Sequence, residues 1–379
     1  MIRVLGGVAV VVLMAGSAGL AAEPDPSATR GPDVIASGGS HTCRIEPDST
    51  VACWGDNGFW QLGDGGDGRS ASPVAVAGVA GATGLAAGDW HTCAIVKAGA
   101  VVCWGKNDLM QLGTAKPRRS SRPVSVAVGP AVELAAAHSH TCARLADGSV
   151  WCWGGNKDDQ LGVQAPPRQT SSAPVKVPGI ERAVSIAAGN EHSCAAVADG
   201  RLFCWGDNHY GQLGHGIQRH NSFPPQPVAI QSEVAQVVAG TRHTCARLRD
   251  LTVQCWGDNV EGQVGNGTTT RALTPAPVAT VDANGTAVPL ADVERLSAGW
   301  HHTCALLANR EVLCWGSNVF GQLARVEGAR ALHATSSGFD DVAALAAGGQ
   351  HTCVVRMDRA TFCVGREDAG TGEHDPQAR

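Results

Sequence analysis

The chain has 379 residues, 44% of them hydrophobic and 17% charged, and its formal net charge is −5 at pH 7. The apolar fraction is ample for a globular core. Lysine and arginine are scattered singly, so no basic stripe is available to neutralise phosphates, and we expect no nucleic-acid partner.

The N-terminal segment has the features of an export signal. Arg3 supplies a positive charge, Val4 to Leu13 is apolar, and small residues lead to Ala22, where cleavage is expected. The alternative is a retained anchor, because residues 4–22 carry no charge over 19 positions. We predict a signal peptide at 1–22, a linker at 23–32, and a mature protein without membrane attachment that is secreted, periplasmic or at the cell surface.

The cysteines reveal seven repeats. All fourteen fall into pairs ten residues apart, and such a fixed self-similarity indicates a repeat architecture. We assign residues 33–365 to repeats of about 50 residues and expect a disordered tail at 366–379. Paired cysteines after an export signal indicate an oxidising compartment. The pairs are Cys43 and Cys53, Cys93 and Cys103, Cys142 and Cys152, Cys194 and Cys204, Cys245 and Cys255, Cys304 and Cys314, and Cys353 and Cys363.

Each repeat contains the same succession of short extended runs. A segment such as 87–93 is followed by a turn, a Cys-Trp-Gly run such as 101–105, and a loop ending in Gln-Leu-Gly, as at 111–113. A Pro-Val run such as 73–76 comes next, and then an apolar stretch such as 184–188. Short Val-rich runs bounded by Gly, Pro and Asn predict strands, and four strands per repeat predict a propeller blade. We therefore predict an all-β, seven-bladed β-propeller, and we expect a monomer.

The cysteine spacing fits a tight hairpin. In the third repeat, Asp147-Gly148 marks a turn midway between Cys142 and Cys152. A three-residue loop from Ala146 to Gly148, with the glycine left-handed, places the two cysteines opposite each other. We predict one disulfide per blade, each closing a loop of about eleven residues and contributing at most about 2.5–3 kcal/mol.

The last repeat is incomplete, because the pattern stops at Gly365 without its Gln-Leu-Gly and Pro-Val parts. We therefore expect one short blade. Residues 33–35 are expected to supply a strand in the place that Leu85 and Ala86 hold before the second repeat.

The motif Ala-Gly-x-x-His-Thr-x-Ala-Leu, followed by Trp-Gly-x-Asn-x-x-Gly-Gln-Leu-Gly, resembles the regulator of chromosome condensation repeat over residues 35–365. The resemblance implies a seven-bladed propeller. The eukaryotic namesake is a nuclear guanine-nucleotide exchange factor for a small GTPase, and a secreted bacterial relative is a protein inhibitor of β-lactamases. The signal peptide and paired cysteines depart from the namesake. Trp60, Met110 and Asp159 also depart, since they stand where the motif has the Gly before Gln.

Three kinds of residue recur at fixed positions of the repeat. A histidine two residues before each first cysteine is either a zinc ligand or, as we expect, a buried residue bonded to neighbouring backbone. The tryptophan after the second cysteine is expected to pack between blades. The asparagine three residues after this tryptophan is expected to be a turn residue that tolerates unusual backbone angles.

The residues between Gly and His differ in every repeat, and ring symmetry places them around one end of the propeller. Trp90 and Trp300 are not demanded by the fold, because the other repeats lack Trp there. Two exposed Trp side chains beside Arg indicate a protein interface. The alternatives are incidental variation and an interface at the opposite end, where we expect Trp60 and residues 282–289. The predicted partner-binding residues are Asp89, Trp90, His138, Glu191, Arg242, Trp300 and His301.

These observations favour a protein–protein interaction module that binds an unknown protein partner. We expect no catalysis, no cofactor and no bound metal. The resemblance leaves open a guanine-nucleotide exchange activity, and a cell-surface or cell-wall polymer-acting enzyme is the other alternative. Two or three carboxylates converging at one mouth of the channel would favour the enzyme.

Overall fold

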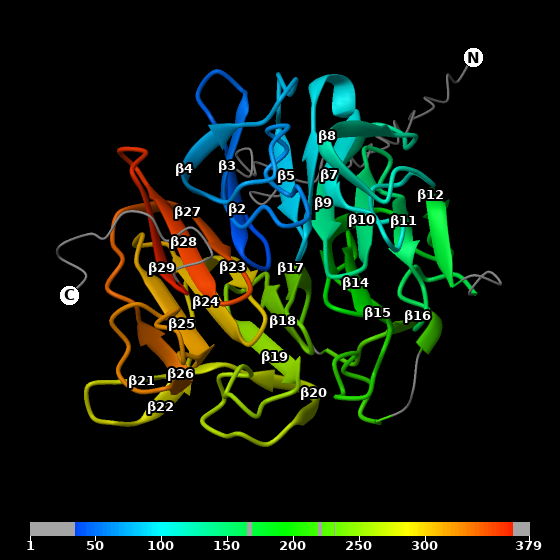
Figure 1. Cartoon of the computed structure of the whole chain (residues 1–379). Helices are drawn as coiled ribbons and strands as arrows, with labels where there is room; N and C mark the ends of the chain where they lie inside the picture. The colour runs from blue at the N-terminus through cyan, green and yellow to red at the C-terminus, as the bar shows by residue number, and fades with distance from the viewer. Residues whose placement is uncertain (1–34, 165–168, 219–221, 231, 367–379) are drawn as a thin grey trace, which may run out of the picture. The chain divides into compact units, whose positions relative to one another are not determined.

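Antiparallel β-strands make up nearly all the regular structure of the computed structural model, which describes residues 35–164, 169–218, 222–230 and 232–366 (Figure 1). The chain divides into two units, residues 1–30 and 31–379, and the first lies outside the described residues. The predicted signal peptide, the linker, residues 33 and 34, and the tail beyond Arg366 also lie outside them. Within the described ranges, no helix is long and apolar enough to cross a bilayer.

The strands form seven sheets, which are the blades of an all-β propeller as predicted. Blade 1 contains β1 (Ile35–Ser37), β2 (His41–Ile45), β3 (Val51–Gly55) and β4 (Ser70–Ala75). Blade 2 contains β5 (Gly84–Ala87), β6 (His91–Ile95), the short 3-10 helix η2 (Lys97–Gly99), β7 (Val101–Lys106) and β8 (Arg119–Val126). Blade 3 contains β9 (Ala131–Ala136), β10 (His140–Leu145), β11 (Val150–Gly155) and β12 (Thr170–Lys176).

The remaining blades follow in the same order along the chain. Blade 4 contains β13 (Ala183–Ala188), β14 (His192–Val197), β15 (Leu202–Gly206) and β16 (Ser222–Pro227). Blade 5 contains β17 (Val234–Ala239), β18 (His243–Leu248), β19 (Val253–Gly257) and β20 (Ala272–Pro277). Blade 6 contains β23 (Val293–Ala298), β24 (His302–Leu307), β25 (Val312–Ser317) and β26 (Arg330–Ser336), and the hairpin of β21 (Ala279–Val281) and β22 (Ala287–Pro289) extends its outer edge. Blade 7 contains β27 (Val342–Ala347), β28 (His351–Arg356) and β29 (Thr361–Gly365).

Strand direction alternates within each blade, so the connections sort to two ends of the propeller. The turn between the first and second strands and the loop between the third and fourth strands lie at one end, which we call the front face. The turns between second and third strands lie at the other end, together with the β21–β22 hairpin that contains residues 282–286. Trp60 lies in a front-face loop, so its expected place at the opposite end is wrong.

The hairpin of the second and third strands has the predicted register in every blade. Cys142 lies directly opposite Cys152, and Gly148 closes the three-residue loop with a positive φ of 78°. The backbone N–H of Leu145 donates to Ser149 across the neck of this loop at 2.9 Å.

The disulfide prediction is confirmed in all seven blades. Every bond lies within its own repeat, and the Cα–Cα distances are 4.0–4.1 Å. The structure joins Cys43 to Cys53, Cys93 to Cys103, Cys142 to Cys152, Cys194 to Cys204, Cys245 to Cys255, Cys304 to Cys314, and Cys353 to Cys363.

Neighbouring blades pack together through the predicted tryptophan, except that blade 7 has Val364 in its place and packs this valine on blade 6. Trp104 of blade 2 is fully buried in a cluster with Leu62 and Val76 of blade 1. Its indole N–H donates to the Gln61 carbonyl oxygen at 2.8 Å, so the polar edge of the ring is satisfied inside the apolar contact. Equivalent bonds of 2.9–3.0 Å serve the buried tryptophans of blades 3 to 6.

The recurring histidine forms a second link between blades, and its partner differs from our expectation. Each ring Nε2 bonds a side-chain hydroxyl of the next blade rather than backbone. This hydroxyl belongs to the Thr or Ser that follows the histidine of that next blade in the sequence. The bonds are His41–Thr92 (2.7 Å), His91–Thr141 (2.8 Å), His140–Ser193 (2.8 Å), His192–Thr244 (3.0 Å), His243–Thr303 (2.8 Å), His302–Thr352 (2.9 Å) and His351–Thr42 (2.8 Å).

The hydroxyl chemistry fixes the tautomer of the four histidines whose partner hydroxyl itself donates to a backbone carbonyl, namely His41, His91, His140 and His192. Thr92 donates its hydroxyl hydrogen to the Gln61 carbonyl at 3.1 Å, so His41 Nε2 must be the donor in the bond between the two side chains. The other ring nitrogen, Nδ1, is then a bare acceptor, and it is buried without a hydrogen-bond partner in all seven histidines. The neighbouring thiols are joined in disulfides, so no thiolate is present for the zinc alternative.

Blade 7 is the short blade that the sequence predicts. Within the described residues its sheet has three strands, whereas the others have at least four. Ile35 lies in β1, the innermost strand of blade 1, in the place that β5 holds in blade 2. The second cysteine of this blade, Cys363, is partly exposed, although all the other cysteines are buried. With three strands in the described part of this blade, one disulfide is less shielded than the rest.

Candidate functional site

The front-face loops are held rigidly by the recurring asparagine. In blade 1 the side chain of Asn57 accepts from the backbone N–H of Leu62 at 3.0 Å and donates to the Gly68 carbonyl at 3.2 Å. The predicted role of this asparagine in unusual backbone angles is wrong, because the positive φ of 67° belongs to Trp60. Trp60 stands where blades 4 to 6 have glycines with φ of 75–80°. A left-handed backbone conformation costs free energy for a residue with a side chain, and the chain nevertheless has tryptophan here.

Backbone hydrogen bonds join neighbouring blades around the mouth of the central channel. The N–H of Thr241 donates to Trp300 at 3.2 Å, and the N–H of Gly349 donates to Gly38 at 2.8 Å. These bonds surround a cavity of about 70 Å³, too small for more than a few waters. Its lining is mostly Ala and Gly, and its larger side chains are Asp89, His138, Asn190, Thr241 and Trp300.

Three side chains from three blades meet at this mouth. The indole N–H of Trp300 donates to Asp89 Oδ1 at 2.8 Å, and His138 Nδ1 lies 2.7 Å from Asp89 Oδ2. A Cβ at Gly349 would lie 2.8 Å from Trp300 Cε2, so this glycine leaves room for the indole. The carboxylate of Asp89 therefore connects blades 2, 3 and 6, and Trp300 is part-buried rather than exposed as we expected.

An aromatic cluster continues this contact outward between blades 1 and 2. The ring of Trp90 packs edge-on against His138 at 4.5 Å and lies 5.6 Å from the ring of Phe59. Lys106 Nζ lies above both rings, 4.1 Å from the Trp90 centroid and 4.7 Å from the Phe59 centroid. Trp90 is also part-buried, which corrects the expectation of an exposed ring.

Other predicted residues lie at separate blade junctions. Arg242 stacks on Tyr210 at 4.2 Å, and Arg271 lies over the same tyrosine at 4.5 Å. His301 sits at the next junction. Burial is the main cause of its lowered pKa, with Asp258 and Glu261 acting in the opposite direction and Arg242 lowering it further.

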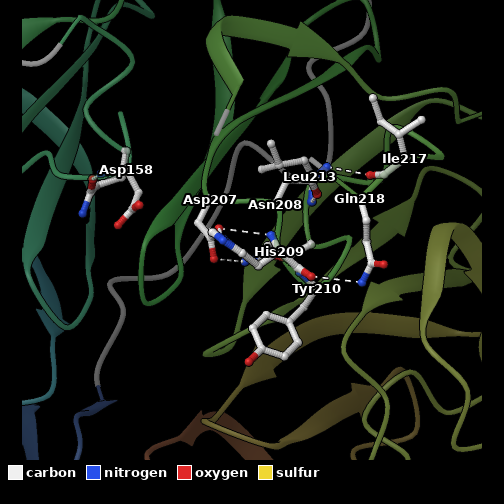
Figure 2. Close-up of polar contacts among 10 residues, drawn as sticks. Asp158, Asp207, Asn208, His209, Tyr210, Leu213, Ile217 and Gln218 are labelled. Carbon is white, nitrogen blue, oxygen red and sulfur yellow. Dashed lines mark hydrogen bonds and ion pairs between the residues drawn. The ribbon is translucent and has the colours of Figure 1, made fainter. Parts of the chain in front are cut away.

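Glu191 faces like charges. Burial raises its pKa first, and the neighbouring carboxylates Asp158 and Asp207 raise it further, whereas Lys157 and His138 act in the opposite direction. Asp207 is held by Gln212 at 2.8 Å and by the side chain of His209, while Asp158 Oδ2 is buried without a hydrogen-bond partner. Figure 2 shows Asp158 on a different segment from the loop that carries Asp207, His209 and Tyr210.

We expect Glu191→Gln to stabilise the protein by about 0.5 kcal/mol at pH 7, because it removes repulsion without removing a hydrogen bond that holds the loop. The gain should disappear as the pH falls through the raised pKa of Glu191, where the native side chain is itself neutral. Urea unfolding at several pH values measures it. Glu261→Gln is the matched control, since Glu261 faces His301; an equal gain there would contradict the repulsion.

The structure thus brings together some of the predicted partner-binding residues and separates others. Asp89, His138 and Trp300 meet at the channel mouth, and Trp90 joins them through His138. Glu191, Arg242 and His301 lie at three other junctions of the front face. Phe59, Lys106 and Tyr210 were missed, although they also vary at fixed positions of the repeat. Phe59 and Tyr210 lie in loops and Lys106 ends β7, so none of them is beside the histidine.

Comparison with protein families gives two overlapping matches. The model described as the RCC1-like domain matches residues 83–378, which is most of the chain. The model of the regulator of chromosome condensation (RCC1) repeat matches residues 48–95.

Individual relatives agree on the architecture. The ultraviolet-B receptor UVR8 of Arabidopsis thaliana is 31% identical over 179 residues, 43% of this chain and 39% of the receptor, so the match spans less than half of that relative. The structure of Saccharomyces cerevisiae Prp20p is 23% identical, with a TM-score of 0.70 over 88% of this chain and 83% of Prp20p. Yeast RCC1 (Prp20) bound to Kap60 is 20% identical, with a TM-score of 0.77 over 97% and 88% of the chains.

Proposed function

Because the chain belongs to the family of RCC1-like domains, we propose that it is a binding propeller that holds a protein partner on its front face. Two related structures support a binding role. One is that of Prp20p, a protein that binds Gsp1p and histones, and the other contains yeast RCC1 bound to Kap60. We propose a protein partner for this chain on the same grounds.

The observation that carries this proposal is the continuous set of contacts from Phe59 through Trp90, His138 and Asp89 to Trp300. It joins four blades and occupies positions that the repeat leaves variable. Large aromatic side chains beside a cation are the usual anchors of protein interfaces, because they bury much area at small entropic cost. We therefore assign this set, rather than the whole predicted ring, as the centre of the interface.

We further propose that the protein works outside the cytosol as a monomer and without catalysis. Seven disulfides within one propeller support an oxidising compartment, because reducing compartments keep such thiols free. The same compartment argues against an exchange factor, whose GTPase lies inside the cell. An enzyme with its site in the channel would be favoured by two or three carboxylates at one mouth. The lining of this mouth contains one, Asp89, and it is held by two hydrogen bonds, which supports a role without catalysis.

A second candidate rests on the group of Glu191, Asp158 and Asp207. A carboxyl group with a raised pKa beside other carboxyl groups is an arrangement used in the hydrolysis of glycosidic polymers. Release of reducing sugar from cell-wall or surface polysaccharide by the native protein, abolished in Glu191→Gln, would favour this enzyme over the binding module.

Truncation of the front-face tryptophans tests the binding role. We expect Trp90→Ala and Trp300→Ala each to weaken capture of the partner by about 2 kcal/mol, roughly 30-fold, when the immobilised protein is used to pull down proteins from host extracts. Trp300→Ala should also cost about 1–2 kcal/mol of stability, because it removes the bond to Asp89.

Trp151 provides the control, since it is also part-buried but lies beside the turn at the opposite end. Its replacement by Ala should leave capture unchanged. If Trp151→Ala weakens capture as much as the front-face changes do, or if both front-face variants bind normally while folded, the front face is not the interface.

A further inference from the structure

Lys106 reverses the charge that the repeat uses at its position. The residue after Trp-Gly is aspartate in blades 1, 4 and 5. There the carboxylate supports the loop: Asp56 accepts from Gln61 Nε2 at 2.6 Å, and Asp207 accepts from Gln212 Nε2 at 2.8 Å. An ammonium group cannot accept these bonds, so the fold gives no reason for lysine here.

The ammonium group of Lys106 is placed over aromatic rings instead. It lies above Trp90 and Phe59, from blades 2 and 1, at the distances at which cation–π attraction is significant. Such attraction leaves the charge without a counter-ion. Among the described residues no carboxylate forms an ion pair with Lys106, and Asp89, which precedes Trp90 in the sequence, is already bonded to Trp300 and His138.

We propose that Lys106, Trp90 and Phe59 form a binding site for a glutamate or aspartate side chain of the protein partner, an inference that rests on the front-face function proposed above. The cation would pair with the carboxylate. The two rings would cover the apolar stem of the incoming side chain and reduce solvent access to the ion pair, which strengthens it.

The surroundings favour a single carboxylate over a polyanion. Asp56, Asp89 and Asp108 lie in the front-face turns and loops of blades 1 and 2, within three residues in the sequence of Phe59, Trp90 and Lys106 respectively, and their negative charge opposes a phosphate backbone. One unpaired ammonium suits one carboxylate, whereas nucleic acids are held by arrays of cations. The neighbouring Arg119 is placed over the ring of Trp60 at 4.0 Å and borders the same surface.

Two acetylated, amidated peptides test the site directly, Leu-Glu-Leu and Leu-Gln-Leu. Binding to the full-length protein with ¹⁵N-labelled tryptophan is followed by the indole N–H signal of Trp90. We expect the Glu peptide to bind about 10-fold more tightly than the Gln peptide, a preference that falls with added salt.

Lys106→Asp is the decisive variant, because it restores the residue that the repeat uses and gives Gln111 the acceptor found in blades 1 and 4. It should melt at the native temperature or above and lose the preference for the Glu peptide. Equal binding of the two peptides, or an unchanged preference in Lys106→Asp, would overturn the proposal. Tighter binding of an oligothymidylate than of the Glu peptide would overturn it in favour of a polyanion.

The peptide and capture experiments distinguish the carboxylate site at Lys106 from partner binding by the front face. The peptides report on the lysine site whether or not a partner has been captured. If Trp90 and Trp300 are needed for capture but the peptides bind without regard to Lys106, the front-face function stands and the carboxylate site does not.

Discussion

Reduction of all seven disulfides is expected to unfold the propeller at about 37 °C and neutral pH. Each bond closes a loop of about eleven residues and restricts the unfolded chain by at most about 2.5–3 kcal/mol, so seven bonds sum to roughly 18–21 kcal/mol. A domain typically has a total stability of only about 5–15 kcal/mol. The reduced chain should therefore lose its β-sheet circular dichroism without heating.

The order of reduction provides a second readout. The bond between Cys353 and Cys363 should open first, because Cys363 is partly exposed while the other thirteen cysteines are buried. Thiol trapping with mass spectrometry at increasing reductant measures this order. A cooperative, native-like melting curve after all fourteen thiols have been alkylated would contradict the expected dependence on the disulfides.

Acid is expected to destabilise the protein steeply between about pH 6.5 and pH 4. Burial lowers the pKa of five ring histidines to about 3 and that of His192 and His351 to about 4, from an ordinary value of 6.5. The physical reason is the bare Nδ1, which would carry its proton in a buried place without an acceptor. Below pH 6.5 these histidines bind protons in the unfolded chain but stay neutral in the folded chain.

The sign and size follow from this difference in bound protons. The free energy of unfolding decreases as the pH falls, by up to about 1.4 kcal/mol per pH unit for each histidine, or roughly 10 kcal/mol per unit for seven. Urea unfolding at closely spaced pH values measures the slope. His302→Gln should reduce the slope by one proton. A slope corresponding to one or two protons in the native protein would contradict the mechanism.

Much of the blade could be predicted because its signals are local. The ten-residue cysteine spacing and the Asp147-Gly148 turn determine one hairpin register, and the structure has this register in all seven blades. The tryptophan positions were equally clear, since a large apolar residue that recurs once per repeat must be buried in the same way each time.

The contacts of the front face could not be predicted from the sequence, because they depend on the geometry across the ring of blades. Asp89 and Trp300 are 211 residues apart, and their bond requires the space above Gly349. Spacing along the chain contains no measure of that space. The histidine partner was missed for a similar reason: the hydroxyl belongs to the next blade, 51 residues away for His41 and 50 for His91, and only the packing angle between blades brings it within hydrogen-bond distance.

The ring of histidine–hydroxyl bonds treats the junction where the ring closes like every other junction. Six of these bonds join blades that the backbone also connects, whereas His351–Thr42 joins blades 7 and 1 and has the same length of 2.8 Å as several of the others. The same side-chain pair thus links neighbouring blades whether or not a peptide linkage runs between them. Circular permutants opened between other blades would preserve every neighbour relation, and the propeller behaves as a cycle in which any blade can serve as the first.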